Sequence, residues 1–118
     1  MIKNMGKKDN LFFVEISDYI TKEDVNEAIP LVEEIIEKYK KMKCLIILND
    51  VKGYTLGGFL ADFNFYLKQH NSFDYVAIVG DKEFEKGMVD LFDKLMPGKA
   101  QYFDILEVEK AQEWIQEK

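Results

Sequence analysis

Short apolar runs alternate along this chain with stretches whose apolar residues recur every three to four positions, and this alternation predicts an α/β fold. Residues 11–16 (LFFVEI), 44–49 (CLIILN) and 75–79 (YVAIV) are rich in the aromatic and β-branched residues that favour strands. The last two runs are almost wholly apolar, which is typical of strands buried on both faces of a sheet. A short last strand is predicted at residues 100–103, and a short edge strand at residues 1–5.

After the predicted strands, apolar residues recur at the spacing of an α-helix. The first helix is expected to begin at Thr21, because Thr21 and Asp24 resemble a capping box. Pro30 lies inside it and is expected to kink the helix or split it in two, since proline removes a backbone donor and clashes with the preceding turn. The helices are expected at residues 21–39, 59–70, 84–95 and 108–116.

The order of these elements predicts the architecture. Strands that are separated by helices pair in parallel through right-handed crossovers. We therefore expect an α/β fold with a mostly parallel, mixed sheet of four to five strands and about four helices. A chain of 118 residues buries about two thirds of its unfolded surface, so residues 1–118 are expected to form a single domain.

The second helix has the most distinctive pattern of apolar residues. One of its sides is predicted to face the core, whereas Phe65 on the opposite side and Tyr66 on the flank are predicted to be exposed. Adjacent aromatic residues on a surface often mark an interface, so Phe65 and Tyr66 are candidates for contact with a protein partner or with a second copy. The predicted core side consists of Leu56, Phe59, Leu60, Phe63 and Leu67.

The aromatic stripes of the second and third helices allow two interpretations. They are most simply core, but an apolar pocket between the helices and the sheet would bind a small apolar or lipid-like ligand. Methionine suits the irregular walls of such a pocket. The residues that would line it are Phe59, Phe63, Phe84, Met88 and Phe92.

Residues 50–58 (DVKGYTLGG) separate the second core strand from the second helix and predict the functional rim of the sheet, where open α/β sheets bind ligands and partners. Asp50, Thr55, Gly57 and Gly58 are the candidates for binding there. The glycines do not have the spacing of a P-loop, and no Lys-Ser/Thr pair follows them. They either expose amide donors to an anion at the helix N-terminus or serve a tight turn.

Charge and composition exclude several classes of function. The chain has sixteen basic and twenty-two acidic residues, and every basic residue is lysine. An acidic chain without arginine is poorly suited to nucleic acid, whose affinity depends on neutralising phosphates. The single cysteine, Cys44, excludes an internal disulfide, and the single histidine, His70, excludes a histidine metal cluster. We therefore expect no enzyme activity and no cofactor.

Three aspartates are the remaining candidates for chemistry. Asp50, Asp81 and Asp104 each follow a predicted strand, where they would bind Mg²⁺ or accept a phosphate, or else serve only as caps and turn residues. The chain does not fit a phosphoacceptor receiver domain, because Ser17-Asp18 stands in place of the acidic pair. No signal peptide or apolar run of about 18 residues is present, so a cytoplasmic protein without a transmembrane segment is expected.

Several short motifs, in order along the chain, resemble the SpoIIAA-like family of small bacterial proteins, whose fold is similar to that of STAS domains. The resemblance implies a mixed, mostly parallel sheet and no settled enzyme activity. It covers nearly the whole chain and rests on Thr21, Asp24, Pro30, residues 48–50, Asp62, His70, residues 77–81, Tyr102, Phe103, Ala111 and Trp114.

The resemblance also implies a kind of function. STAS domains are regulatory modules that bind anti-sigma factors or, in other members, nucleotides or lipids. Sporulation-type members are phosphorylated on the serine of an Asp-Ser-x-Gly motif before the second helix. The corresponding residues 54–57 read Tyr-Thr-Leu-Gly, so that the Asp-Ser pair is missing and Thr55 is the nearest hydroxyl apart from Tyr54. We expect a non-catalytic binding module, or alternatively a carrier of an apolar ligand.

Overall fold

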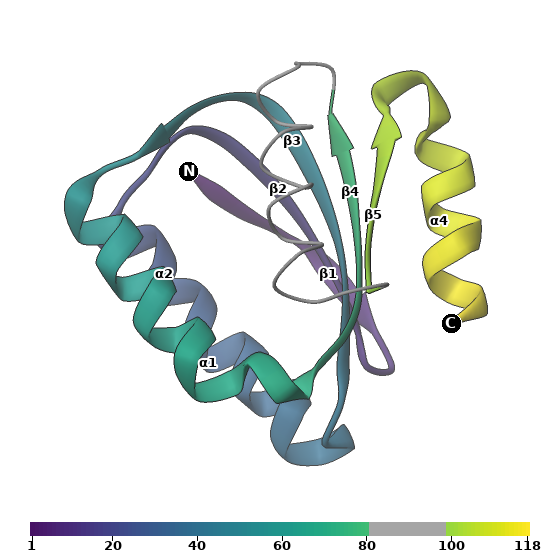
Figure 1. Cartoon of the computed structure of the whole chain (residues 1–118), viewed down its shortest axis with the longest axis horizontal. Coiled ribbons are helices and arrows are strands. Elements are labelled where there is room, and N and C mark those ends of the chain that lie inside the picture. The colour runs from purple at the N-terminus through teal and green to yellow at the C-terminus, as the bar shows by residue number, and fades with distance from the viewer. Residues whose placement is uncertain (81–98) are drawn as a thin grey trace.

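A computed structural model describes residues 1–80 and 99–118 of the chain. These residues form a sheet of five strands that neighbour one another in sequence order (Figure 1). The first two strands are antiparallel and each later strand is parallel to the one before it, which confirms the predicted mixed, mostly parallel sheet. The strands are β1 (Ile2–Lys8), β2 (Leu11–Ile20), β3 (Met42–Tyr54), β4 (Phe73–Gly80) and β5 (Ala100–Asp104).

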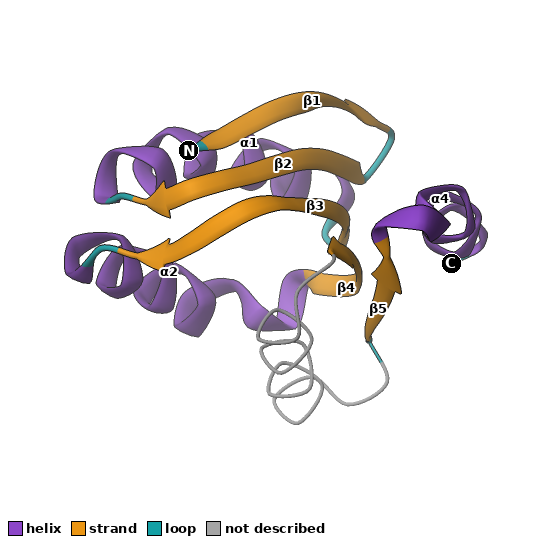
Figure 2. Cartoon of the chain, turned by 90° about the horizontal axis from the view of Figure 1, so that it is seen from above, coloured by secondary structure: helices purple, strands orange, loops and turns teal. Residues whose placement is uncertain are grey.

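Helices cover both faces of the sheet. Helices α1 and α2 lie side by side on one face, and α4 lies on the other (Figures 1 and 2). The predicted helix at 84–95 lies outside the described residues, which contain three α-helices where about four were predicted for the whole chain. The helical elements are α1 (Lys22–Tyr39), α2 (Leu56–Gln69), η1 (His70–Ser72), η2 (Ile105–Glu107) and α4 (Val108–Glu117).

The core strands bury both of their faces, as predicted. Leu11 and Leu45 pack in a cluster beneath α4, whereas their neighbours Phe12 and Cys44 pack in a cluster beneath α1 and α2. This alternation follows from the two-residue period of a strand. Burial raises the pKa of the Cys44 thiol to about 12, which makes Cys44 an unreactive part of the core.

Helix α1 begins as its capping sequence predicts. The Asp24 amide donates to the Thr21 hydroxyl at 3.2 Å, and the Thr21 amide donates to the Asp24 carboxylate at 2.9 Å. The helix then continues through Pro30, so it is not split in two. Pro30 is exposed, whereas Val25 and Val32 on either side of it are buried, and their packing against the sheet holds the helix together across the missing hydrogen bond.

Candidate functional site

The candidate site lies where β2 and β3 end and helices α1 and α2 begin. The two strands stay paired as far as Ile20 and Tyr54, which lie opposite each other. Over this last stretch β3 carries two more residues than β2, because residues 17–20 lie opposite residues 49–54. Residues 50–58 were predicted to separate this strand from the second helix, but residues 50–54 belong to β3 and residues 56–58 belong to α2, which leaves Thr55 between the two elements.

Left-handed backbone explains how β3 takes up its extra residues. Asp50 has a φ of 54°, Gly53 has a φ of 133°, and Asp18 on the neighbouring strand has a φ of 57°. Aspartate and glycine tolerate this conformation, and irregular register of this kind is typical of β-bulges. The residue types that suggested a turn therefore serve a bulged strand end, and Lys52 pairs with Asp18 at 3.5 Å across it.

Thr55 is the N-cap of α2. Its hydroxyl accepts from the Gly58 amide at 3.1 Å and donates to the Ile20 carbonyl at 3.3 Å, and its own amide donates to the same carbonyl at 3.0 Å. Because Ile20 immediately precedes Thr21, the capping threonines of α1 and α2 lie next to each other at the rim. The Thr55 hydroxyl therefore connects the start of α2 to the end of β2.

The two glycines at the start of α2 have different surroundings. Gly58 is buried, and a Cβ atom built on it would lie 2.2 Å from the Ile20 carbonyl oxygen. A Cβ atom on Gly57 would meet only the Lys22 side chain, at 3.4 Å. Gly58 thus allows a close approach between α2 and the end of β2. Both glycines belong to the first turn of α2, so they do not form the tight turn that was one of the two predicted roles.

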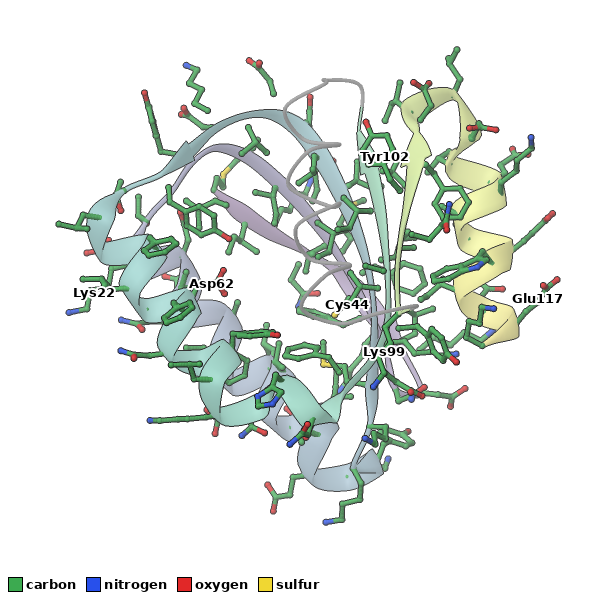
Figure 3. All side chains as sticks on the ribbon, viewed as in Figure 1. Lys22, Cys44, Asp62, Lys99, Tyr102 and Glu117 are labelled. Atoms are coloured by element: carbon green, nitrogen blue, oxygen red, sulfur yellow. The ribbon has the colours of Figure 1, made fainter. Side chains whose placement is uncertain are left out.

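A partly buried polar pair lies beneath α2. The Tyr54 hydroxyl donates to the Asp62 carboxylate at 2.6 Å, and Asp62 lies on the side of α2 that faces the sheet (Figure 3). Burial raises the pKa of Asp62, although the hydrogen bond from Tyr54 partly opposes this shift. Burial also raises the pKa of Tyr54, and the nearby charge of Asp62 raises it further. The pair fixes the rotation of α2 about its own axis.

Asp62 makes stability depend on pH. The free energy of unfolding should fall as the pH rises from the ordinary carboxyl pKa of 3.8 to the higher pKa of folded Asp62, because ionising the partly buried carboxyl costs the folded state free energy. Asp62→Asn should remove this fall. Tyr54→Phe should extend the fall to higher pH, because the hydrogen bond from Tyr54 lowers the pKa of Asp62 and its loss raises that pKa further. Urea unfolding from about pH 4 to 7 tests this, and an equal pH dependence in wild type and Asp62→Asn would contradict it.

The outer face of α2 is apolar, contrary to the predicted orientation. The residues predicted to face the core are instead exposed, so that part of the sequence interpretation is wrong. The rings of Phe59 and Phe63 stack with centroids 5.9 Å apart, and Tyr54 meets Phe59 edge-on at 6.1 Å. The exposed fractions are 76% for Leu56, 50% for Phe59, 52% for Leu60, 46% for Phe63 and 54% for Leu67. We call these five residues the α2 stripe.

The aromatic residues predicted to be exposed are partly buried. Phe65 packs into the cluster beneath α1 and α2, and its ring meets that of Phe73 edge-on with centroids 6.3 Å apart. Tyr66 is partly buried, and its ring centroid lies 5.5 Å from that of His70. Phe65 therefore belongs to the core, and the prediction that Phe65 and Tyr66 are exposed is wrong.

A groove of about 560 Å³ runs between α1 and α2. Its floor contains the partly buried side chains of Ile29, Ala61 and Phe65. Lysines of both helices line it, Lys22 at the start of α1 and Lys68 near the end of α2 (Figure 3 labels Lys22). Sequence reasoning missed this groove, because its existence depends on how the two helices lie beside each other.

The sequence profile of the SpoIIAA-like family matches residues 11–116 of the chain. The chain belongs to the SpoIIAA-like family. Its structure is similar to the crystal structure of an uncharacterized DUF3478-family protein with a SpoIIAA-like fold from Shewanella loihica, at a TM-score of 0.80 and 23% sequence identity. The alignment covers 98% of this chain and 92% of that protein, so the likeness concerns the whole fold. No curated protein matches the chain.

The candidate acidic site of this SpoIIAA-like protein is not assembled by the described residues. Within residues 1–80 and 99–118, no group of three histidine, cysteine, aspartate or glutamate side chains is placed to hold a metal. Asp50 lies within β3, whereas Asp104 ends β5 and accepts from the Leu106 amide at 3.0 Å. Asp81 lies outside the described residues. The same part of the chain contains no helix with the length and apolarity to span a membrane.

The candidate pocket for an apolar ligand is only partly described. Phe59 and Phe63 are on the outer face of α2, and therefore do not point between that helix and the sheet. Phe84, Met88 and Phe92 lie outside the described residues. Thr55, a hydroxyl residue in the stretch that corresponds to the Asp-Ser-x-Gly motif, is exposed as a residue, but its hydroxyl already caps α2.

Proposed function

We propose that this SpoIIAA-like domain is a non-catalytic regulatory module that binds a protein through the α2 stripe. One observation carries the proposal: a single helix exposes five large apolar side chains on one face. Half-exposed leucine and phenylalanine side chains amount to on the order of 500 Å² of apolar surface, which is the size of patch that marks an interaction site on a monomer.

The surroundings of the potentially reactive side chains support a binding role. Cys44 is buried in the core with a raised thiol pKa, so the nucleophilic thiolate is disfavoured. His70 is exposed at the end of α2, where its ring contacts Tyr66 and its Nδ1 atom lies 3.3 Å from the Leu67 carbonyl oxygen. Among the described side chains, neither the cysteine nor the histidine has the partner that nucleophilic catalysis requires.

Site-specific photo-crosslinking in the host cell tests the proposal. A photoreactive amino acid at Leu60 should form a covalent adduct with a protein, because Leu60 is in the middle of the α2 stripe. The matched control is the same amino acid at Leu31, an exposed leucine of α1 outside the stripe. Equal labelling at the two positions would contradict a role for the α2 stripe.

The stacked rings of Phe59 and Phe63 beside Tyr54 favour a second candidate, carriage of a small apolar ligand. Flat aromatic surfaces bind apolar molecules through their area and their geometry. Native mass spectrometry of the purified protein should then show an added mass that disappears on denaturation. A bare protein mass in both measurements would contradict this candidate and leave the protein-binding module.

A further inference from the structure

We propose that the protein which covers the α2 stripe is a second copy of this chain, with the two α2 helices packed antiparallel about a two-fold axis. The inference rests on the proposed function and names its partner. It draws on three properties of the stripe: the spacing of its residues, its charge and its area.

The spacing of the stripe fits another α-helix. Leu56, Leu60, Phe63 and Leu67 follow one another at intervals of four, three and four residues. This is the spacing with which the side chains of one helix insert between those of a partner helix in a coiled coil. Phe59 flanks this row and stacks on Phe63, which widens the seam. A helix of the same pattern is therefore a complementary partner.

The charge distribution favours self-association at this face. The chain has a formal charge of −6, which makes two copies repel each other over most of their surface. Residues 56–69, all of them described, contain one acidic residue, Asp62, and its side chain is turned towards Tyr54 and the sheet. Two copies can therefore meet along α2 without bringing the carboxylates of the two α2 helices together.

The exposed area of the α2 stripe accounts for the apolar centre of a small dimer interface. A stable interface buries about 800 Å² on each partner, and the stripe supplies more than half of that as apolar surface. Asn64 and Lys68 are exposed beside the stripe and would form part of a polar rim. Antiparallel packing aligns the helix dipoles favourably and keeps the two Lys68 ammonium groups apart. It places Leu56 opposite Leu67 of the second copy, and Leu60 opposite Phe63.

The oligomeric state tests the proposal first. Analytical ultracentrifugation should show that the full chain is a dimer and that Leu60→Glu is a monomer with an unchanged circular dichroism spectrum, because Leu60 is half exposed. Leu31→Glu, at an exposed leucine of α1, should remain a dimer. A monomeric wild type at every concentration, or a dimer that persists in Leu60→Glu, overturns the proposal. A monomer that instead binds lipid vesicles overturns it as well.

Disulfide formation tests the antiparallel arrangement. A mixture of Leu56→Cys and Leu67→Cys should form an intermolecular disulfide, whereas Leu56→Cys alone should not, because its two copies would be about 16 Å apart along the helix pair. Cys44 is buried and leaves the introduced thiol as the accessible one. Crosslinking of Leu56→Cys with itself overturns the antiparallel geometry.

The failure of this inference differs from a failure of the proposed function. If the wild type is monomeric but a photoreactive group at Leu60 labels a different protein, the second copy is excluded and the binding module remains. If the wild type is monomeric and Leu60 labels no more protein than Leu31, both are rejected.

Discussion

Gly58→Ala is expected to lower the free energy of unfolding by about 3 kcal/mol, because the new methyl group would overlap the Ile20 carbonyl oxygen at 2.2 Å. That oxygen belongs to the backbone and accepts two hydrogen bonds from Thr55, so it cannot turn aside as a flexible side chain would. This overlap can be relieved only if α2 moves away from the end of β2. Such a movement would also weaken the Thr55 cap and the Tyr54–Asp62 hydrogen bond.

Gly57→Ala is the matched control for this change. Its new methyl group would meet only the side chain of Lys22, which can shift, and alanine favours a helix over glycine by up to about 1 kcal/mol. We therefore expect Gly57→Ala to leave the protein as stable as the wild type or slightly more stable. Urea unfolding of both variants measures the difference. Equal destabilisation by the two substitutions would show that α2 does not approach β2 as closely as described.

The sheet could be predicted because its signals are local. The apolar runs at residues 44–48 and 75–79 are long enough to be buried on both faces, and helices between parallel strands leave few alternatives for the topology. The capping box at Thr21 was equally visible, since it needs only two side chains three residues apart. The core strands and the start of α1, which a few neighbouring residues decide, were predicted with the correct type and place.

The orientation of α2 could not be predicted because distant contacts decide it. The side with the larger apolar residues was assigned to the core, as amphipathic helices usually require. Gly58 and Asp62 override that preference, since one must approach Ile20 and the other bonds to Tyr54. The sequence did contain a sign of the buried face of α2. The small residues Gly58 and Ala61 lie on the same face as Phe65, at intervals of three and four residues. The bulged end of β3 was missed for a different reason, because aspartate and glycine suit turns and bulges alike.

The observed orientation of α2 predicts effects of very different size for two phenylalanines of the same helix. Phe65→Ala is expected to lower the free energy of unfolding by about 2 kcal/mol, because its ring fills the space between α2 and the sheet beside Phe73. Phe63→Ala is expected to change it by less than about 0.5 kcal/mol in the monomer, since its ring is on the outer face and is 46% exposed. If the side of α2 with the larger apolar residues faced the core, Phe63→Ala would be the more destabilising of the two substitutions.

The two substitutions also separate folding from association. Unfolding should be measured at a dilution where the protein is monomeric, since a dimer adds stability that depends on concentration. At higher concentration Phe63→Ala should weaken the dimer, because its ring contributes to the α2 stripe and supports Phe59 by stacking. Phe65→Ala should destabilise the monomer and affect the dimer only through folding. If Phe63→Ala proved the more destabilising of the two in the monomer, α2 would be turned the other way, and the exposed stripe that supports the binding proposals would not exist.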